Sequence, residues 1–216
     1  MRPAFRSRQR GFLLNPARFG AAPAASTSLI DLPMTGTSGS TSFPDSGSLG
    51  LTWTANGDAQ VSTVIEAAGA LILDGSGDFL SASFANSTLS DFRIRFSAQK
   101  SANGVSGYDC AVATDTTAGA YNGFFVELST SRGLIVFLYG QVLGISYSFN
   151  PNDGVMHDYD IQRIGSAITA KIDGVQVASS TNSTPCITNS GVIQIGRCGT
   201  FYPFNGTIKN FKLSVS

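Results

Sequence analysis

The chain has 216 residues, enough for one domain of ordinary size or two small ones. Only 13% of its residues are charged, with 14 basic against 14 acidic side chains, while 24 are glycine, 15 phenylalanine and 6 tyrosine. So much apolar material excludes a disordered chain. The scarcity of charge and the many glycines favour an all-β domain with frequent turns over a helical one.

The first twenty residues differ from the rest in charge. They hold five arginines and no acid, so the remainder carries nine basic and fourteen acidic side chains, a net charge of −5. GFLL (residues 11–14) is too short for the apolar region of about 7–15 residues in a secretory signal. An organellar transit peptide fits the composition better, but Pro3, Gly11 and Pro16 would break its helix.

We therefore expect residues 1–28 to be a basic, extended anchoring arm with its linker, and residues 29–216 to be the folded domain. Five arginines would contact an acidic groove on a neighbouring subunit, and apolar side chains would fill pockets there. The expected anchoring residues are Arg2, Phe5, Arg6, Arg8, Arg10, Phe12, Leu13, Leu14, Arg18 and Phe19.

From about Val61 the sequence indicates one strand after another. In DFRIRFSAQ (91–99) apolar and arginine side chains alternate, which is typical of a half-buried strand. GFFVELS (123–129) places Phe124, Val126 and Leu128 on one face. LIVFLYG (134–140) is apolar on both faces, and VLGISYSFN (142–150) alternates again.

The C-terminal third predicts a hairpin and a closing strand. In SAITAKIDGVQVASS (166–180) the pair Asp173-Gly174 is a two-residue turn between alternating segments. VIQIG (192–196) follows as another strand. In GTIKNFKLSVS (206–216), Ile208 is out of step with the alternating Phe211, Leu213 and Val215, and a bulge near Asn210 would bring all of them onto one face. No window of ten residues has helical spacing, apart from a single turn at VIEAAG (64–69).

These strands resemble the concanavalin A-like, laminin-G-like jelly-roll family over about residues 40–216. The resemblance rests on LILDGSGDFLSAS, DFRIRFSAQ, MHDYDIQRIGSAITAKIDGVQVASS, VIQIGR and FNGTIKNFKLSVS. It implies an all-β fold, an antiparallel two-sheet jelly-roll sandwich, carrying the extended N-terminal arm.

The combination of the arm, a Ser/Thr/Gly-rich segment and one such domain resembles structural proteins of tailed-bacteriophage virions. It implies a non-enzymatic capsid-decoration or tail/fibre component, made in the host cytoplasm and located in the virion. Its partners would be other virion proteins and further copies of itself. Contact with nucleic acid or a membrane is not expected. The alternative is a carbohydrate-binding adhesion module for host glycans, and the two roles are compatible.

Catalysis is not expected. Glycoside hydrolysis needs two carboxylates facing one cleft, yet the only glutamates are Glu66 and Glu127, and no acid follows Glu127 at i+2 or i+4. His157, the single histidine, lacks the partners of a nucleophilic triad.

No cofactor or metal is expected either. The candidate loop ligands Asp115, Asn122, Asn150, Asn152 and Asp153 also fit turns, because Asx side chains bond their own backbone. Three cysteines and one histidine do not have zinc-site spacing. Cys110, Cys186 and Cys198 are expected as free thiols, although Cys186 and Cys198 flank one strand and could approach each other.

Aromatic residues outside the strand pattern are the candidate ligand contacts. Their rings could stack on sugars or on a neighbouring subunit, and core packing is the alternative. They are Trp53, Tyr121, Phe201, Tyr202 and Phe204.

Overall fold

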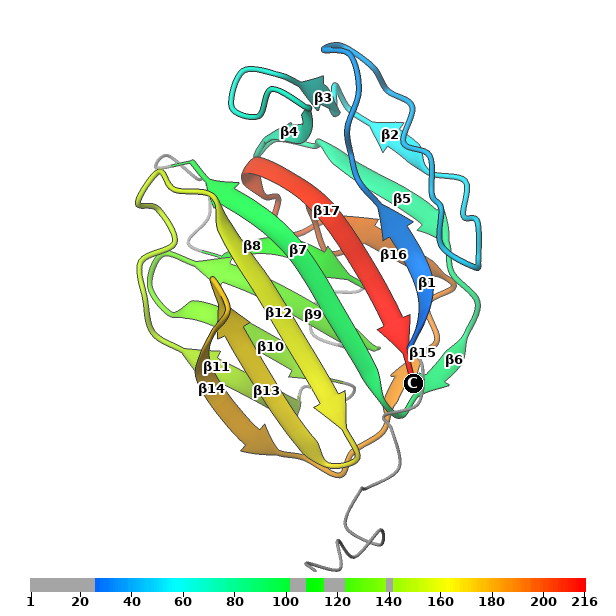
Figure 1. Ribbon diagram of the computed structural model, residues 1–216, viewed down its shortest axis with the longest axis vertical. Helices are drawn as coiled ribbons and strands as arrows, with labels where there is room; N and C mark the ends of the chain where they lie inside the picture. Colours follow the sequence, from blue (N-terminus) through cyan, green and yellow to red (C-terminus); the bar gives the residue numbers. More distant parts are fainter. Residues whose placement is uncertain (1–25, 102–107, 115–122, 139–141) are drawn as a thin grey trace, which may run out of the picture.

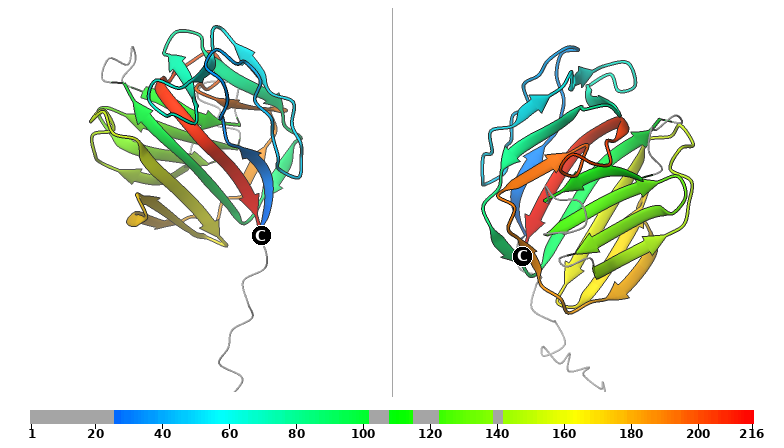
Figure 2. Two further views of the ribbon diagram at one scale, coloured as in Figure 1. Left: turned by 45° about the horizontal axis from the view of Figure 1, so that its top comes forward. Right: turned by 180° about the vertical axis from the view of Figure 1, so that it is seen from behind.

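The computed structural model describes residues 26–101, 108–114, 123–138 and 142–216 (Figure 1). Its strands form two large antiparallel sheets that face each other, which confirms the predicted all-β sandwich of jelly-roll type (Figure 2). The described residues contain no helix, and hence none that could cross a membrane. The expected anchoring arm and Tyr121 lie outside the described residues.

The first sheet has eight strands, ordered β14-β13-β12-β7-β17-β4-β3 with β1 also pairing β17. Its strands are β1 (Thr27–Leu32), β3 (Gln60–Ser62), β4 (Ala70–Asp74), β7 (Phe92–Lys100), β12 (His157–Ile164), β13 (Ala167–Ile172), β14 (Val175–Thr181) and β17 (Asn205–Val215).

The second sheet has seven strands, ordered β11-β10-β9-β8-β16-β5-β2, and a two-stranded ribbon pairs β15 with β6. The seven strands are β2 (Thr54–Asn56), β5 (Phe79–Ser83), β8 (Tyr108–Ala113), β9 (Phe124–Ser129), β10 (Gly133–Leu138), β11 (Val142–Tyr147) and β16 (Val192–Ile195). The ribbon strands are β6 (Ser87–Leu89) and β15 (Cys186–Thr188).

The core lies between the facing sheets, as the alternating patterns predict. On β7, Phe92, Ile94 and Phe96 are buried, while Arg93 and Arg95 lie on the opposite face. Strand β9 departs from simple alternation, because all six of its residues are buried. Its outward face is therefore covered as well as its inward face.

Strand β17 contains the predicted bulge. Its pairing with β7 shifts register between Lys209 and Lys212, and Asn210 takes a left-handed φ of 56°. The extra residue allows Ile208 and Phe211, three positions apart, both to be buried in the core. A strand without the bulge would turn one of them outward.

The Asp173-Gly174 turn joins β13 to β14 as predicted. Both turn residues have positive φ, 52° and 79°, the conformation that a two-residue hairpin turn requires.

One expectation about the N-terminal half needs correction, and one strand there was not predicted. Residues 64–69 form no helical turn; they form a bend and a tight turn closed by a Gly69 N–H bond to the Glu66 carbonyl. Strand β1 begins at Thr27, two residues before the expected domain boundary, and pairs with the second half of β17. The apolar stretch that forms β1 is short and flanked by serine and proline, so its sequence does not predict a strand in the sheet.

His157 ties the hairpin turn to the loop before β12. Its Nδ1 lies 2.7 Å from an Asp173 carboxylate oxygen and its Nε2 2.9 Å from one of Asp153. Burial opposes charge on the ring, but the two carboxylate bonds outweigh it and raise the pKa of His157 above 6.5. The pKa of Asp153 is lowered chiefly by His157, and that of Asp173 chiefly by the Asp158 backbone N–H and then by His157.

We predict that this contact stabilises the fold most between pH 3.8 and 6.5. A raised histidine pKa gives stability that is full below 6.5 and lost as the pH rises through the folded value. Lowered aspartate pKa values give stability that is lost as the pH falls below 3.8. The melting-temperature loss in His157→Gln should be largest near about pH 5.5 and shrink by about pH 9. An equal loss at both pH values would contradict the assignment.

Candidate functional site

The outward face of β8, β9 and β10 carries a cluster of aromatic rings. Phe125 on β9 pairs across the ladder with Phe137 on β10, while its neighbours Phe124 and Val126 point into the core. Phe125 points outward yet is only 1% exposed, because the rings of Phe137 and Tyr202 pack on it at centroid distances of 5.9 Å. We call this surface the outer aromatic patch: Tyr108, Phe125, Arg132, Phe137, Phe201 and Tyr202.

The loop between β16 and β17 places two of these rings. Cys198 and Phe201 exchange backbone hydrogen bonds of 3.1 and 2.8 Å, which closes a tight turn. The Tyr202 carbonyl then accepts a bond from the Cys110 N–H on β8, so the loop is fixed across the sheet. Tyr202 has a left-handed φ of 56°, an unfavourable conformation for a large side chain that the surrounding bonds hold in place.

Two rings of the patch are open to solvent. Tyr108 is 42% exposed and Phe201 is 49% exposed. Tyr202 lies against both: its ring centre is 5.9 Å from that of Tyr108 and 6.2 Å from that of Phe201. The Tyr202 ring meets Tyr108 at an interplanar angle of 72° and Phe201 at 46°, so the three rings form a partly exposed aromatic surface against which an apolar ligand face can pack.

Arg132 adds a charged group to this aromatic surface. Its guanidinium lies 4.6 Å from the Tyr108 ring centre, and its Nη2 donates to both carboxylate oxygens of Glu127 at 2.9 Å. Glu127 is almost fully buried, and burial raises its pKa despite the opposing effect of Arg132. The Arg132 side chain stays 42% exposed, so it can also donate to a ligand.

In the structure, the predicted aromatic contacts fall into two groups. Phe201 and Tyr202 come together on the outer aromatic patch. Trp53 and Phe204 are corrected to core residues, 8% and 0% exposed, because both point between the sheets. Tyr121 lies outside the described residues.

Sequence reasoning missed Tyr108 and Arg132. Tyr108 reads as the first residue of an ordinary strand, and Arg132 as part of a turn. The available signal was Glu127: an acid within a strand that is apolar on its other face needs a partner, and the nearest arginine in sequence is Arg132.

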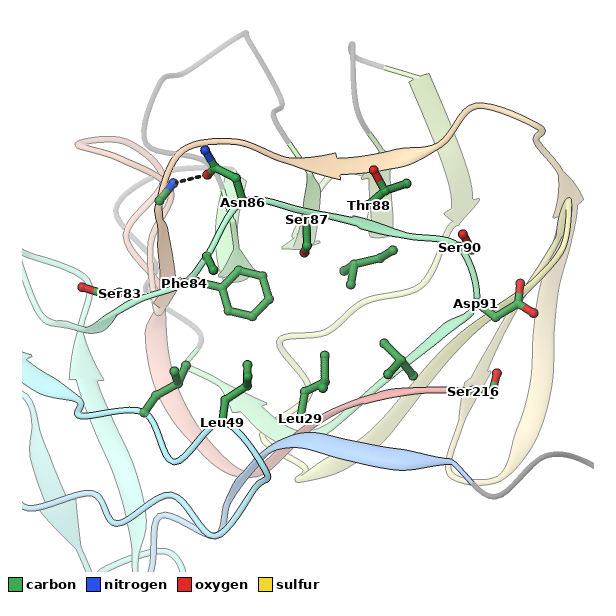
Figure 3. Close-up of a pocket in the computed structure, with 15 residues that line it drawn as sticks. Leu29, Leu49, Ser83, Phe84, Asn86, Ser87, Thr88, Ser90, Asp91 and Ser216 are labelled. Atoms are coloured by element: carbon green, nitrogen blue, oxygen red, sulfur yellow. Dashed lines mark hydrogen bonds between the residues drawn. The ribbon is translucent and has the colours of Figure 1, made fainter.

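Apart from the outer aromatic patch, the structure has a hollow at the end of the sandwich where β17 ends. It has a volume of about 880 Å³ and opens between the segment from Ser83 to Asp91 and the segments that carry Leu29 and Leu49 (Figure 3). Phe84 points into it from one side, and Leu29 and Leu49 from the other. We call it the end cavity; its apolar lining residues are Leu29, Leu49, Leu51, Phe84, Leu89 and Val215.

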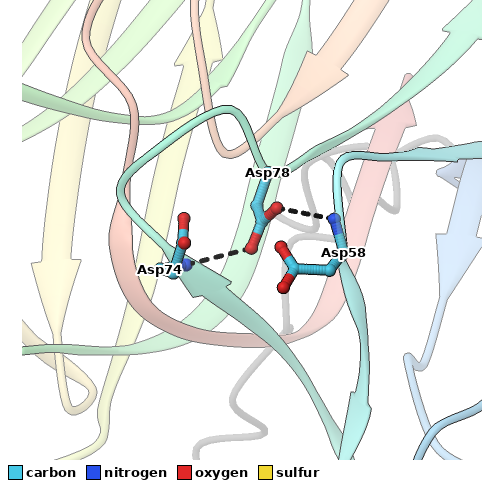
Figure 4. A group of neighbouring side chains, drawn as sticks. All are labelled: Asp58, Asp74 and Asp78. Carbon is cyan, nitrogen blue, oxygen red and sulfur yellow. Dashed lines mark hydrogen bonds between the residues drawn. The ribbon is translucent and has the colours of Figure 1, made fainter.

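Three carboxylates meet where the β2–β3 and β4–β5 turns approach each other. Ligand oxygens of Asp58, Asp74 and Asp78 lie within 4.8 Å of one another, close enough to share a cation (Figure 4). The two oxygens of buried Asp78 accept the backbone N–H groups of Asp58 and Asp74 at 2.9 and 3.2 Å. Burial is the main cause that raises the pKa of Asp78 to about 6. Through these two hydrogen bonds Asp78 joins the two turns. The sequence predicts only a turn at DGSGD (74–78), the segment that contains Asp74 and Asp78.

The candidate loop ligands, which the sequence predicts to be turn residues instead, make turns where the structure describes them. The side-chain Oδ1 of Asn150 accepts from the Asn152 backbone N–H, and the side-chain Oδ1 of Asp153 accepts from the Val155 backbone N–H. Asp115 and Asn122 lie outside the described residues.

The three cysteines are buried thiols, and Cys186 forms no disulfide with Cys198. Burial raises the pKa of Cys186 to about 12 and that of Cys110 well above its ordinary value, so neither thiol is a ready nucleophile.

Solved structures share this fold. No family model and no curated protein matches the chain. Domain 4 of AbnA, a GH43 extracellular arabinanase from Geobacillus stearothermophilus, in complex with arabinotriose, aligns with a TM-score of 0.65 at 14% identity, covering 88% of this chain and 93% of that one. The binding domain of Paraclostridial Mosquitocidal Protein 1 aligns at 0.65 and 13%, covering 87% and 48%.

The binding domain of Botulinum Neurotoxin DC in complex with SialylT aligns at 0.64 and 12% identity, covering 87% of this chain and 47% of that one. This chain therefore spans about half the length of the toxin binding domains that it matches. At these identities the likeness shows the fold alone.

We predict that Arg132→Gln destabilises the protein by about 1–3 kcal/mol, because it leaves the buried Glu127 carboxylate without its charged partner. The double variant Arg132→Gln/Glu127→Gln should recover most of this loss, since a neutral amide needs no counter-charge. Urea denaturation at neutral pH measures the free energy of unfolding of both variants. If Arg132→Gln alone unfolds at the wild-type urea concentration, Arg132 does not support Glu127.

Proposed function

We propose that this domain is a non-catalytic glycan-binding module and that the outer aromatic patch is its binding surface. The observation that carries the proposal is the pair of solvent-exposed rings, Tyr108 and Phe201, set beside the half-exposed guanidinium of Arg132. Elsewhere on the described surface the exposed large apolar side chains are mostly aliphatic.

Sugars match this combination of groups. The C–H face of a pyranose or furanose ring is apolar and packs on an aromatic ring, while its hydroxyls need hydrogen-bond donors and acceptors at the edge. Tyr108 and Phe201 supply the stacking faces. Arg132 supplies N–H donors whose direction is fixed by Glu127. The end cavity also has polar lining residues, but it offers a single aromatic ring, Phe84, and no cationic side chain among the residues that line it.

The structural neighbours support a binding role. The arabinanase domain is described with arabinotriose and a neurotoxin binding domain with SialylT, so this fold is used for ligand recognition in other proteins. A fold alone does not fix a function. The proposal for this chain therefore rests on its own patch, within a concanavalin A-like jelly roll.

The absence of catalysis is part of the proposal. Glu127 is held by Arg132, and the nearby Asp109 by buried Lys100 at 2.7 Å. Glu66, the other glutamate, pairs with Lys209 at 2.8 Å. Neither glutamate is thus free to work opposite a second acid across a sugar, as glycoside hydrolysis requires.

The virion role predicted from the arm remains a separate proposal. A displayed glycan-binding module is compatible with a particle-anchored protein whose partners are capsid or tail subunits. Homo-oligomer formation and location in the virion likewise stay predictions.

Replacing the exposed rings should weaken glycan binding. A glycan array first identifies a ligand, and calorimetric titration then compares variants. Tyr108→Ala and Phe201→Ala should each reduce affinity about fivefold to tenfold, since an aromatic contact contributes about 1–1.5 kcal/mol. Val64→Ala, which trims an 87% exposed apolar side chain elsewhere, is the matched control and should bind normally. Unchanged affinity in the Tyr108→Ala/Phe201→Ala double variant would refute the assignment.

A further inference from the structure

The end cavity is an apolar surface that the described residues leave open. Its volume of about 880 Å³ falls within the range of about 300–1,000 Å³ typical of sites that enclose a ligand. Leu49 at its edge is 46% exposed, and Leu29, Leu51 and Val215 are only partly buried. The cavity is therefore large enough, and apolar enough at these side chains, to accept a short apolar segment.

The N-terminal arm leaves the domain beside this cavity. Ser26, the first described residue, lines a smaller hollow of about 400 Å³. That hollow shares Asp91, Val215 and Ser216 with the end cavity, so the two adjoin each other.

We infer that the apolar part of the arm, residues 11–19, occupies the end cavity of its own chain. The arm's largest apolar cluster is there: Phe12, Leu13, Leu14 and Phe19. An extended chain spans about 3.3–3.6 Å per residue, so the seven residues from Phe19 to Ser26 reach up to about 25 Å. A tether of this length lets the apolar cluster reach a cavity that adjoins the hollow lined by Ser26.

Charge and tethering both favour this occupant. The arm carries five positive charges and the rest of the chain a net −5, so the two attract each other. A tethered segment also acts at an effective concentration of about a millimolar, which favours the chain's own arm over the arm of a second copy in dilute solution. The arm side chains that would fill the cavity are apolar. Added salt should therefore weaken the contact less than removal of the arm's phenylalanine rings does.

A disulfide trap in the full chain tests this placement. Asn15→Cys puts a thiol next to Leu14 in the arm, and Ser90→Cys puts one at the cavity edge, where Ser90 is drawn in Figure 3. The three native cysteines are 0% exposed and do not compete. Under mild oxidation the intrachain disulfide should form about tenfold or more faster than in the control pair Asn15→Cys/Ser76→Cys. Ser76 follows Asp74, which pairs with the first residue of β17, so it lies at the opposite end of that strand.

Further substitutions separate the apolar contact from simple tethering. In the Asn15→Cys/Ser90→Cys protein, adding Phe12→Ser and Leu14→Ser should lower the rate to that of the control pair. Adding Arg6→Gln and Arg8→Gln should change it by less than about threefold. Equal rates for the two cysteine pairs, or a rate unaffected by the two serines, would overturn the inference. Crosslinked dimers as the main product in dilute solution would assign the cavity to a second copy and overturn the placement within one chain.

Discussion

The pairing of β17 with its neighbours sets the positions of both surfaces discussed above. This strand pairs with β7 along one edge, while its other edge pairs first with β4 and then with β1. The left-handed Asn210 lies between those two partners, and the bulge there keeps Ile208 and Phe211 both in the core. The loop that comes from β16 in the second sheet to β17 carries Phe201 and Tyr202 of the outer aromatic patch, while the last residue of β17, Val215, lines the end cavity.

The strand pattern and the turns could be predicted from the sequence because both depend on local chemistry. Alternation along β7, the Asp173-Gly174 turn and the bulge at Asn210 each follow from a few consecutive residues. Strand β1 could not be predicted, because its place is set by pairing with a segment about 180 residues later. Trp53 and Phe204 were misplaced for the same reason: loop-like surroundings in sequence do not show which loops fold over the core.

The two open surfaces differ in chemistry and therefore suit different ligands. The outer aromatic patch combines exposed rings with a charged donor whose carboxylate partner is buried, an arrangement suited to a ligand with apolar faces and polar edges. The end cavity combines leucine, valine and phenylalanine side chains with several polar ones and lies beside Ser26, the first described residue, an arrangement suited to a segment of the chain's own arm. They lie on different parts of the fold, so one can be altered without the other.

The central claim is that the outer aromatic patch binds glycans. Backbone and side-chain NMR spectra of the full chain, recorded during titration with an oligosaccharide selected on an array, test it most directly. The account predicts that the largest shifts fall on Tyr108, Arg132, Phe201 and Tyr202, with the segment from Ser83 to Asp91 unchanged. Shifts confined to that segment or to the outward face of the eight-stranded sheet would contradict it.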